Sequence, residues 1–158
     1  MSPVDRGSIE ITRRFEAPVE RVWRAFTEPG EMTAWMWAGM GANPRASADV
    51  RPGGWYEVAI DHTEEGWEGD TAAKRGVYAV VDPPHRLVFT IHWDAAMGYN
   101  QQGTCVPSEV AVVRLIADGA ATVMEFEHHG VPDDGVAAGV HEAGIAAEFD
   151  HLAALVEV

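Results

Sequence analysis

The residues of this chain that could carry out chemistry are its histidines, of which there are seven. His141 precedes Glu142, as in the zinc-binding helix of metalloproteases, where a second histidine must follow one turn after the first. Ile145 occupies that position instead. A zinc site also needs three or four ligands, and no spacing of histidine, cysteine and acidic residues matches a metal motif. The sequence therefore predicts no metal and no cofactor.

Acid–base catalysis is a better hypothesis for two of these histidines. His128 alternates with Met124 and Phe126 on a predicted strand, and His141 extends an apolar helical stripe back by one turn from Ile145. Both imidazoles are expected to face an interior whose apolar walls would shift the pKa of an ionisable group. The alternative is a hydrogen-bonded histidine with a structural role, because perturbed groups also arise without function.

The composition narrows the class of protein. Of 158 residues, 47% are hydrophobic and 23% are charged, which is usual for a globular domain. The formal net charge of −14 argues against a nucleic-acid partner. The single Cys105 indicates a reducing compartment, and no segment has the apolar length of a signal peptide or membrane span. We expect one cytoplasmic domain over residues 1–158, without membrane insertion and with a flexible N-terminus over residues 1–7.

The element that must position the candidate residues is a helix over residues 136–158. Ile145, Phe149, Leu152 and Val156 recur at the spacing of one helical face. A helix of about twenty residues is roughly 30 Å long, and its apolar stripe must pack on another element. We therefore expect the preceding residues to form a sheet that wraps this helix.

The preceding residues predict an α+β arrangement. Alternation or helical spacing predicts a first strand at residues 8–16 and two short helices at 19–26 and 31–37. The glycine-rich residues 38–48 are expected to form a loop. Further strands are predicted near residues 56–60, 76–81, 87–93, 109–116 and 121–129. Asp118-Gly119 predicts a hairpin, and the aperiodic residues 94–108 predict a long loop that acts as a lid.

Several stretches of the chain resemble one protein family. They are residues 11–18 with 22–29, then 49–54, 81–90 and 128–132. These stretches are similar to the activator-of-heat-shock-protein-90-ATPase-homologue-like family of the START/Bet v-like helix-grip superfamily (SRPBCC, polyketide cyclase-like). The resemblance implies a curved seven-stranded antiparallel sheet around the C-terminal helix, two short helices after the first strand, and a hydrophobic cavity. Members of the superfamily include lipid carriers, cyclases, hydroxylase domains and co-chaperones.

The predicted inward faces and this resemblance together define a candidate pocket. A largely apolar pocket of about 300–1,000 Å³ would accept a small hydrophobic or amphipathic ligand. Its expected lining residues are Trp35, Met36, Tyr56, Val58, Phe89, Ile91, Met124, Phe126, His128, His141, Ile145 and Phe149. The first hypothesis is a ligand-binding protein without an assigned reaction. The alternatives are a cyclase- or dehydratase-type enzyme that uses an inward histidine or carboxylate, and a co-chaperone-like interaction module. The sequence leaves open whether the protein forms a homodimer and whether it binds a chaperone.

Overall fold

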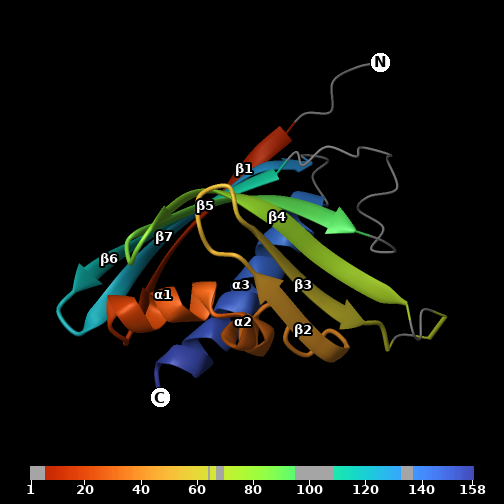
Figure 1. Cartoon of the computed structure of the whole chain (residues 1–158), viewed down its shortest axis with the longest axis horizontal. Helices are drawn as coiled ribbons and strands as arrows, with labels where there is room; N and C mark the ends of the chain where they lie inside the picture. Colours follow the sequence, from red (N-terminus) through yellow and green to blue (C-terminus); the bar gives the residue numbers. More distant parts are fainter. Residues whose placement is uncertain (1–5, 64, 67–69, 95–108, 133–136) are drawn as a thin grey trace.

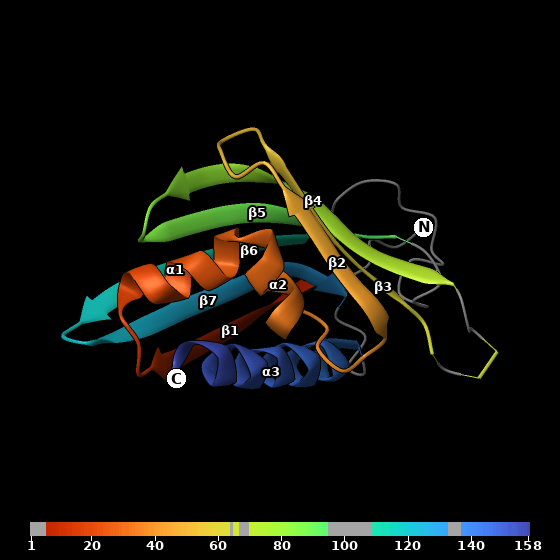
Figure 2. The same ribbon diagram turned by 60° about the horizontal axis from the view of Figure 1, so that its bottom comes forward.

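A computed structural model (Figure 1) describes residues 6–63, 65–66, 70–94, 109–132 and 137–158. In chain order the elements are β1 (Arg6–Phe15), α1 (Val19–Thr27), α2 (Pro29–Trp35), β2 (Ala42–Ala48), β3 (Trp55–Asp61), β4 (Thr71–Asp82), β5 (Arg86–Asp94), β6 (Glu109–Asp118), β7 (Ala121–Pro132) and α3 (Ala137–Val156). The strands form one seven-stranded antiparallel sheet in the order β1-β7-β6-β5-β4-β3-β2. Figure 2 shows α1, α2 and α3 on one face of this curved sheet. This arrangement confirms the expected α+β helix-grip fold.

The predicted hairpin is present between β6 and β7. Asp118 pairs with Ala121, so that Gly119 and Ala120 form a two-residue turn. Gly119 has a φ of +60°, which glycine adopts at little steric cost.

The strand registers define which side chains face the helices. Residues opposite one another on neighbouring antiparallel strands point to the same face of a sheet. Phe89 lies opposite Ala111, and Val113 lies opposite Phe126. All four side chains are buried in one core cluster with residues of α1, α2 and α3. The face that carries them is therefore the concave, inner face of the sheet.

The C-terminal half of α3 packs into the core. Its buried residues are Phe149, Leu152, Ala153 and Val156, the face predicted from the sequence. The side chains at positions 142–147 are exposed, apart from the half-buried Ile145. Among the described side chains of α3, the core therefore covers residues 148–156 more completely than residues 142–147.

The prediction of a loop over residues 38–48 is wrong, because residues 42–48 form β2. This strand pairs only with β3 and is an edge of the sheet. Pro44 is tolerated there because an edge strand has unpaired positions. The small residues of β2 carry too little apolar pattern to identify it as a strand.

The predicted bounds of other elements differ from the structure as well, most clearly those of α2, β4 and β7. Helix α2 begins at Pro29 rather than residue 31, and Trp37 lies beyond its end with a φ of 56°. Strand β4 begins at Thr71, five residues before the strand predicted at residues 76–81, and β7 continues to Pro132. The expected lid falls mostly on residues 95–108, and these lie outside the described residues.

An unusual contact between β4 and β5 occurs at Gly76. The Val77 N–H donates to Thr90 Oγ1 over 2.9 Å, and the Tyr56 hydroxyl donates to the Thr90 carbonyl oxygen over 2.8 Å. A Cβ added to Gly76 would overlap that carbonyl oxygen and lie 2.7 Å from Cε1 of Tyr56. Only glycine fits here, because the Tyr56 ring crosses β4 directly over this position.

Replacing Phe149 or Leu152 by alanine is expected to lower the free energy of unfolding by about 2–5 kcal/mol, because each change leaves a cavity in a packed core. His151→Ala is the matched control, since His151 is exposed on the same helical turn. This control should change stability by less than about 0.5 kcal/mol. Urea denaturation measures all three variants. Losses below about 1 kcal/mol for both core variants would contradict the packing of α3.

Gly76→Ala is expected to destabilise the fold by at least about 1–3 kcal/mol, because the added methyl group forces a backbone or ring movement. Gly30→Ala in α2 is its control, since nothing lies within 4 Å of a Cβ at Gly30. That control should be neutral or stabilising by up to about 1 kcal/mol, because alanine favours helix more than glycine does. Equal thermal unfolding of the two variants would rule out the close contact over Gly76.

Candidate ligand-binding site

The residues predicted to line a pocket lie in the interior wherever their side chains are described. The buried ones are Trp35, Met36, Tyr56, Val58, Phe89, Ile91, Met124, Phe126, His128 and Phe149, and Ile145 is half-buried. His141 belongs to the first turns of α3, but its side chain lies outside the described part of the structure. The sequence therefore identified an inward-facing set of residues correctly, and their part in binding stays a prediction.

The end of the concave face beneath α1 and α2 is closely packed. Trp35 donates its Nε1–H to the carbonyl oxygen of Ala25 over 2.9 Å, and its ring centroid lies 5.0 Å from that of Phe26. A small cavity of about 10 Å³ remains at this end. Its lining residues are Phe26, Met32, Met36, Tyr56, Tyr78, Leu87 and Phe89. Such a volume accommodates about one water molecule, and not a ligand.

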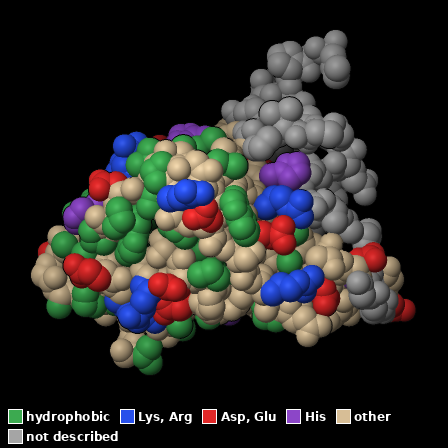
Figure 3. Space-filling view, viewed as in Figure 1, with side chains coloured by type: hydrophobic (Ala, Val, Ile, Leu, Met, Phe, Trp, Pro, Cys, Tyr) green, Lys and Arg blue, Asp and Glu red, His purple; other side chains and the backbone are tan. Residues whose placement is uncertain are grey.

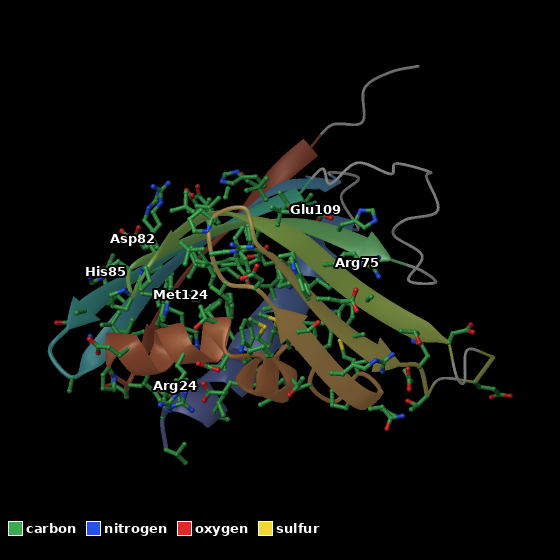
Figure 4. All side chains as sticks on the ribbon, viewed as in Figure 1. Arg24, Arg75, Asp82, His85, Glu109 and Met124 are labelled. Carbon is green, nitrogen blue, oxygen red and sulfur yellow. The ribbon has the colours of Figure 1, made fainter. Side chains whose placement is uncertain are left out.

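The other end of the concave face carries buried ionisable side chains. Lys74, Glu109 and His128 have exposed fractions of only 8%, 6% and 2%. Lys74 lies opposite the inward-facing Val58 on β3, and Glu109 lies opposite the inward-facing Ile91 on β5. Figure 4 shows Glu109 toward the end of the sheet away from Met124. The concave face is therefore apolar at one end and polar at the other.

His128 and Glu109 form a buried pair. His128 lies opposite Ala111 on β6, and its Nε2 is 3.1 Å from Oε1 of Glu109. In this hydrogen bond Nε2–H donates when Glu109 Oε1 accepts. A carboxylate that orients an imidazole in this way is an arrangement suited to proton transfer.

Tyr56 links this polar end to the rest of the core. Burial raises the pKa of the Tyr56 phenol well above its ordinary value, and the nearby Tyr78, Glu109 and Glu148 raise it further. Glu148 on α3 also accepts the backbone N–H of Trp37 over 3.2 Å. The Tyr56 hydroxyl therefore stays neutral and acts as a hydrogen-bond donor.

Sequence reasoning missed Lys74 and Glu109. Glu109 begins an alternating set of buried residues that continues through Ala111, Val113 and Leu115, so the strand period was a signal for its inward direction. Lys74 lies between the strands predicted at residues 56–60 and 76–81, so the sequence pattern did not place it on a face. Lys74 is the only lysine of the chain, and the other residues with Lys-type or Arg-type cationic side chains are all arginines.

The described residues contain neither a metal centre nor a membrane helix. In these parts of the chain, no group of three or more histidine, cysteine and acidic side chains is placed to hold a metal ion. Within the same ranges, no helix is long and apolar enough to cross a membrane.

Because the Tyr56 phenol stays neutral in the folded protein, the free energy of unfolding should depend on pH in the alkaline range. Below about pH 10 the phenol is neutral in the folded and unfolded chain, and above it only the unfolded chain ionises readily. The free energy of unfolding should therefore fall by up to about 1.4 kcal/mol per pH unit above about pH 10 because of this group. The stability difference between wild type and Tyr56→Phe should be constant below about pH 9 and shrink above about pH 10. Urea denaturation from neutral to alkaline pH tests this, and a pH-independent difference would contradict it.

Comparison with known proteins places the chain in a family. Residues 16–157 match the family model described as Activator of Hsp90 ATPase homolog 1-like protein. None of the curated proteins matches the chain. Among solved structures, protein CV1439 from Chromobacterium violaceum has a TM-score of 0.72 at 24% identity, covering 96% of this chain and 97% of its own. Protein Mll3558 from Rhizobium loti has a TM-score of 0.73 at 23% identity, with coverage of 98% and 99% respectively. These structures share the fold, and the family match over most of the sequence shows that the chain belongs to the Activator of Hsp90 ATPase homolog 1-like family.

Proposed function

We propose that this protein is a single helix-grip domain that binds a small amphipathic molecule between α3 and the concave face of its sheet. The observation that carries the proposal is the buried polar group of Lys74, Glu109 and His128 beside an aromatic core. These three side chains place ionisable and hydrogen-bonding groups on the inner face, next to apolar residues of the same face. A ligand with an apolar body and an anionic head group would interact with both parts of this face.

The proposed position of the ligand follows from the packing of the two ends. The end beneath α1 and α2 is filled by side chains, among them Trp35 and Met36. At the other end, we place the ligand between the polar side chains and Ile145, which is half-buried and packs against the core. In this proposal Ile91, Phe126 and Ile145 contact the apolar body of the ligand. Trp35 and Met36, which were expected to line the pocket, form its closed end.

The proposed ligand carries a carboxylate or a similar anion. Lys74 supplies a cationic side chain on the inner face, where His128 Nε2 and Glu109 Oε1 also lie 3.1 Å apart. A buried ammonium group interacts strongly with an anion because the surrounding dielectric constant is low. A purely apolar ligand would make no charged or hydrogen-bonded contact with these groups.

A second candidate function is acid–base catalysis of the cyclase or dehydratase type. The specific observation in its favour is the hydrogen bond between Glu109 and His128. The carboxylate would hold the imidazole in the tautomer whose Nδ1 accepts a proton.

The cytoplasmic location indicated by Cys105 stays a prediction.

Binding of 11-(dansylamino)undecanoic acid, a fluorescent amphipathic carboxylate, tests the first proposal. The probe is expected to bind at about one-to-one stoichiometry, and Lys74→Met should weaken binding about tenfold, equivalent to about 1.4 kcal/mol. Val58→Trp, which enlarges the side chain opposite Lys74, should abolish binding. Arg51→Met is the control, since Arg51 is an exposed cation that pairs with Asp49.

Circular dichroism must show that each variant remains folded. Ile145→Trp replaces Val58→Trp if the latter unfolds, because Ile145 is only half-buried and has room to accept a larger ring. Equal affinity of the wild type, Lys74→Met and the folded tryptophan variant would show that the probe binds elsewhere, and the proposal would then be wrong.

A further inference from the structure

The convex face of the sheet carries a hollow that the proposed function does not use. It has a volume of about 360 Å³ and is lined by Trp55, Tyr56, Glu57, Arg75, Gly76, Val77, Thr90 and His92. Outward side chains of β3, β4 and β5 surround it, and Gly76 lies at its centre. We refer to these eight residues as the convex hollow. Its volume is within the range of small-molecule sites.

One side of the convex hollow is apolar and exposed. Trp55 and Val77 lie opposite one another on β3 and β4. Their exposed fractions are 48% and 49%, although both are large hydrophobic residues. An exposed indole beside an exposed isopropyl group offers a surface on which an aromatic ring can stack or pack edge-on.

The floor of the convex hollow is held in place by contacts from both faces. Thr90 is fixed on the outer side because its Oγ1 accepts the Val77 N–H over 2.9 Å. Tyr56 is fixed on the inner side by its 2.8 Å bond to the Thr90 carbonyl oxygen. The hollow is therefore formed before any ligand binds, which lowers the entropy cost of binding.

The other side of the convex hollow is charged. Arg75 lies opposite Glu57 on β3 and opposite His92 on β5. Its Nη2 is 3.2 Å from Oε2 of Glu57, and both side chains are partly exposed. Figure 4 shows Arg75 on β4, and Figure 3 shows basic and acidic side chains next to one another over the viewed face. The guanidinium therefore has an acidic neighbour on one side and an imidazole on the other.

We propose that the convex hollow binds a small aromatic carboxylate. The aromatic ring packs against Trp55 and Val77, and the carboxylate binds Arg75 and His92. Arginine suits this anion because its planar guanidinium can donate two parallel hydrogen bonds to a carboxylate. His92 adds a second donor from the neighbouring strand, whereas Glu57 competes with the ligand for Arg75. An aromatic cation would lie next to two hydrogen-bond donors, Arg75 and His92, and one carboxylate, Glu57. The lining of the convex hollow therefore favours an anion.

Titration of ¹⁵N-labelled protein with 2-naphthoate tests this site by nuclear magnetic resonance. Saturable shifts are expected for the Trp55 indole N–H and for the backbone N–H groups of Val77 and His92. Arg75→Gln should weaken binding at least about tenfold, which corresponds to the loss of a charge-assisted pair. Glu57→Gln should strengthen it severalfold, because the competing carboxylate is removed. 2-Naphthamide, which has the same rings without the charge, should bind much more weakly.

One control separates this site from other cations of the protein. Arg51→Gln removes an exposed arginine that also pairs with a carboxylate, at 2.8 Å from Asp49, but lies outside the convex hollow. This variant should shift the Trp55, Val77 and His92 signals with 2-naphthoate as the wild type does. Equal binding by Arg75→Gln, equal binding of the amide, or shifts that do not saturate would overturn the proposal, and the concave-face proposal would be unaffected.

Discussion

The aromatic contacts of Phe149 connect the parts of the core. Its ring centroid lies 5.0 Å from that of Phe126 on β7 and 6.3 Å from that of Trp35 on α2. Trp35 in turn contacts Phe26 on α1 and donates a hydrogen bond to the carbonyl oxygen of Ala25. Edge-on and tilted ring pairs at these distances add to the free energy gained by burial. The orientation of α1, α2 and α3 on the sheet thus depends on one ring at the middle of α3.

This packing gives the concave face two different halves. Where α1 and α2 cover the sheet, apolar side chains pack around a cavity of about 10 Å³. Toward the other end the same face carries the buried side chains of Lys74, Glu109 and His128. The proposed amphipathic ligand would match this gradient, because its head group and its apolar body require different surroundings. In that proposal the packed half would supply rigidity and the polar half would supply specificity.

The sequence predicted the elements whose residues follow a clear period. The stripe of α3, the hairpin at Gly119 and the inward set from Tyr56 to Phe126 all correspond to the structure. Strand β2 was missed because its small residues and Pro44 resemble a loop. Lys74 and Glu109 were missed because charged side chains normally indicate a solvated face. The convex hollow could not be predicted, since it depends on the relative register of β3, β4 and β5.

Alternation along β4 gives the two faces separate chemistry over very few residues. Lys74 points to the concave face and Arg75 to the convex face, because successive side chains of a strand point in opposite directions. Gly76 follows, and because it has no side chain, the Tyr56 ring lies directly against the backbone there. Tyr56 therefore lines both the small interior cavity and the convex hollow. The Tyr56 ring is therefore the physical connection between this interior cavity and the convex hollow.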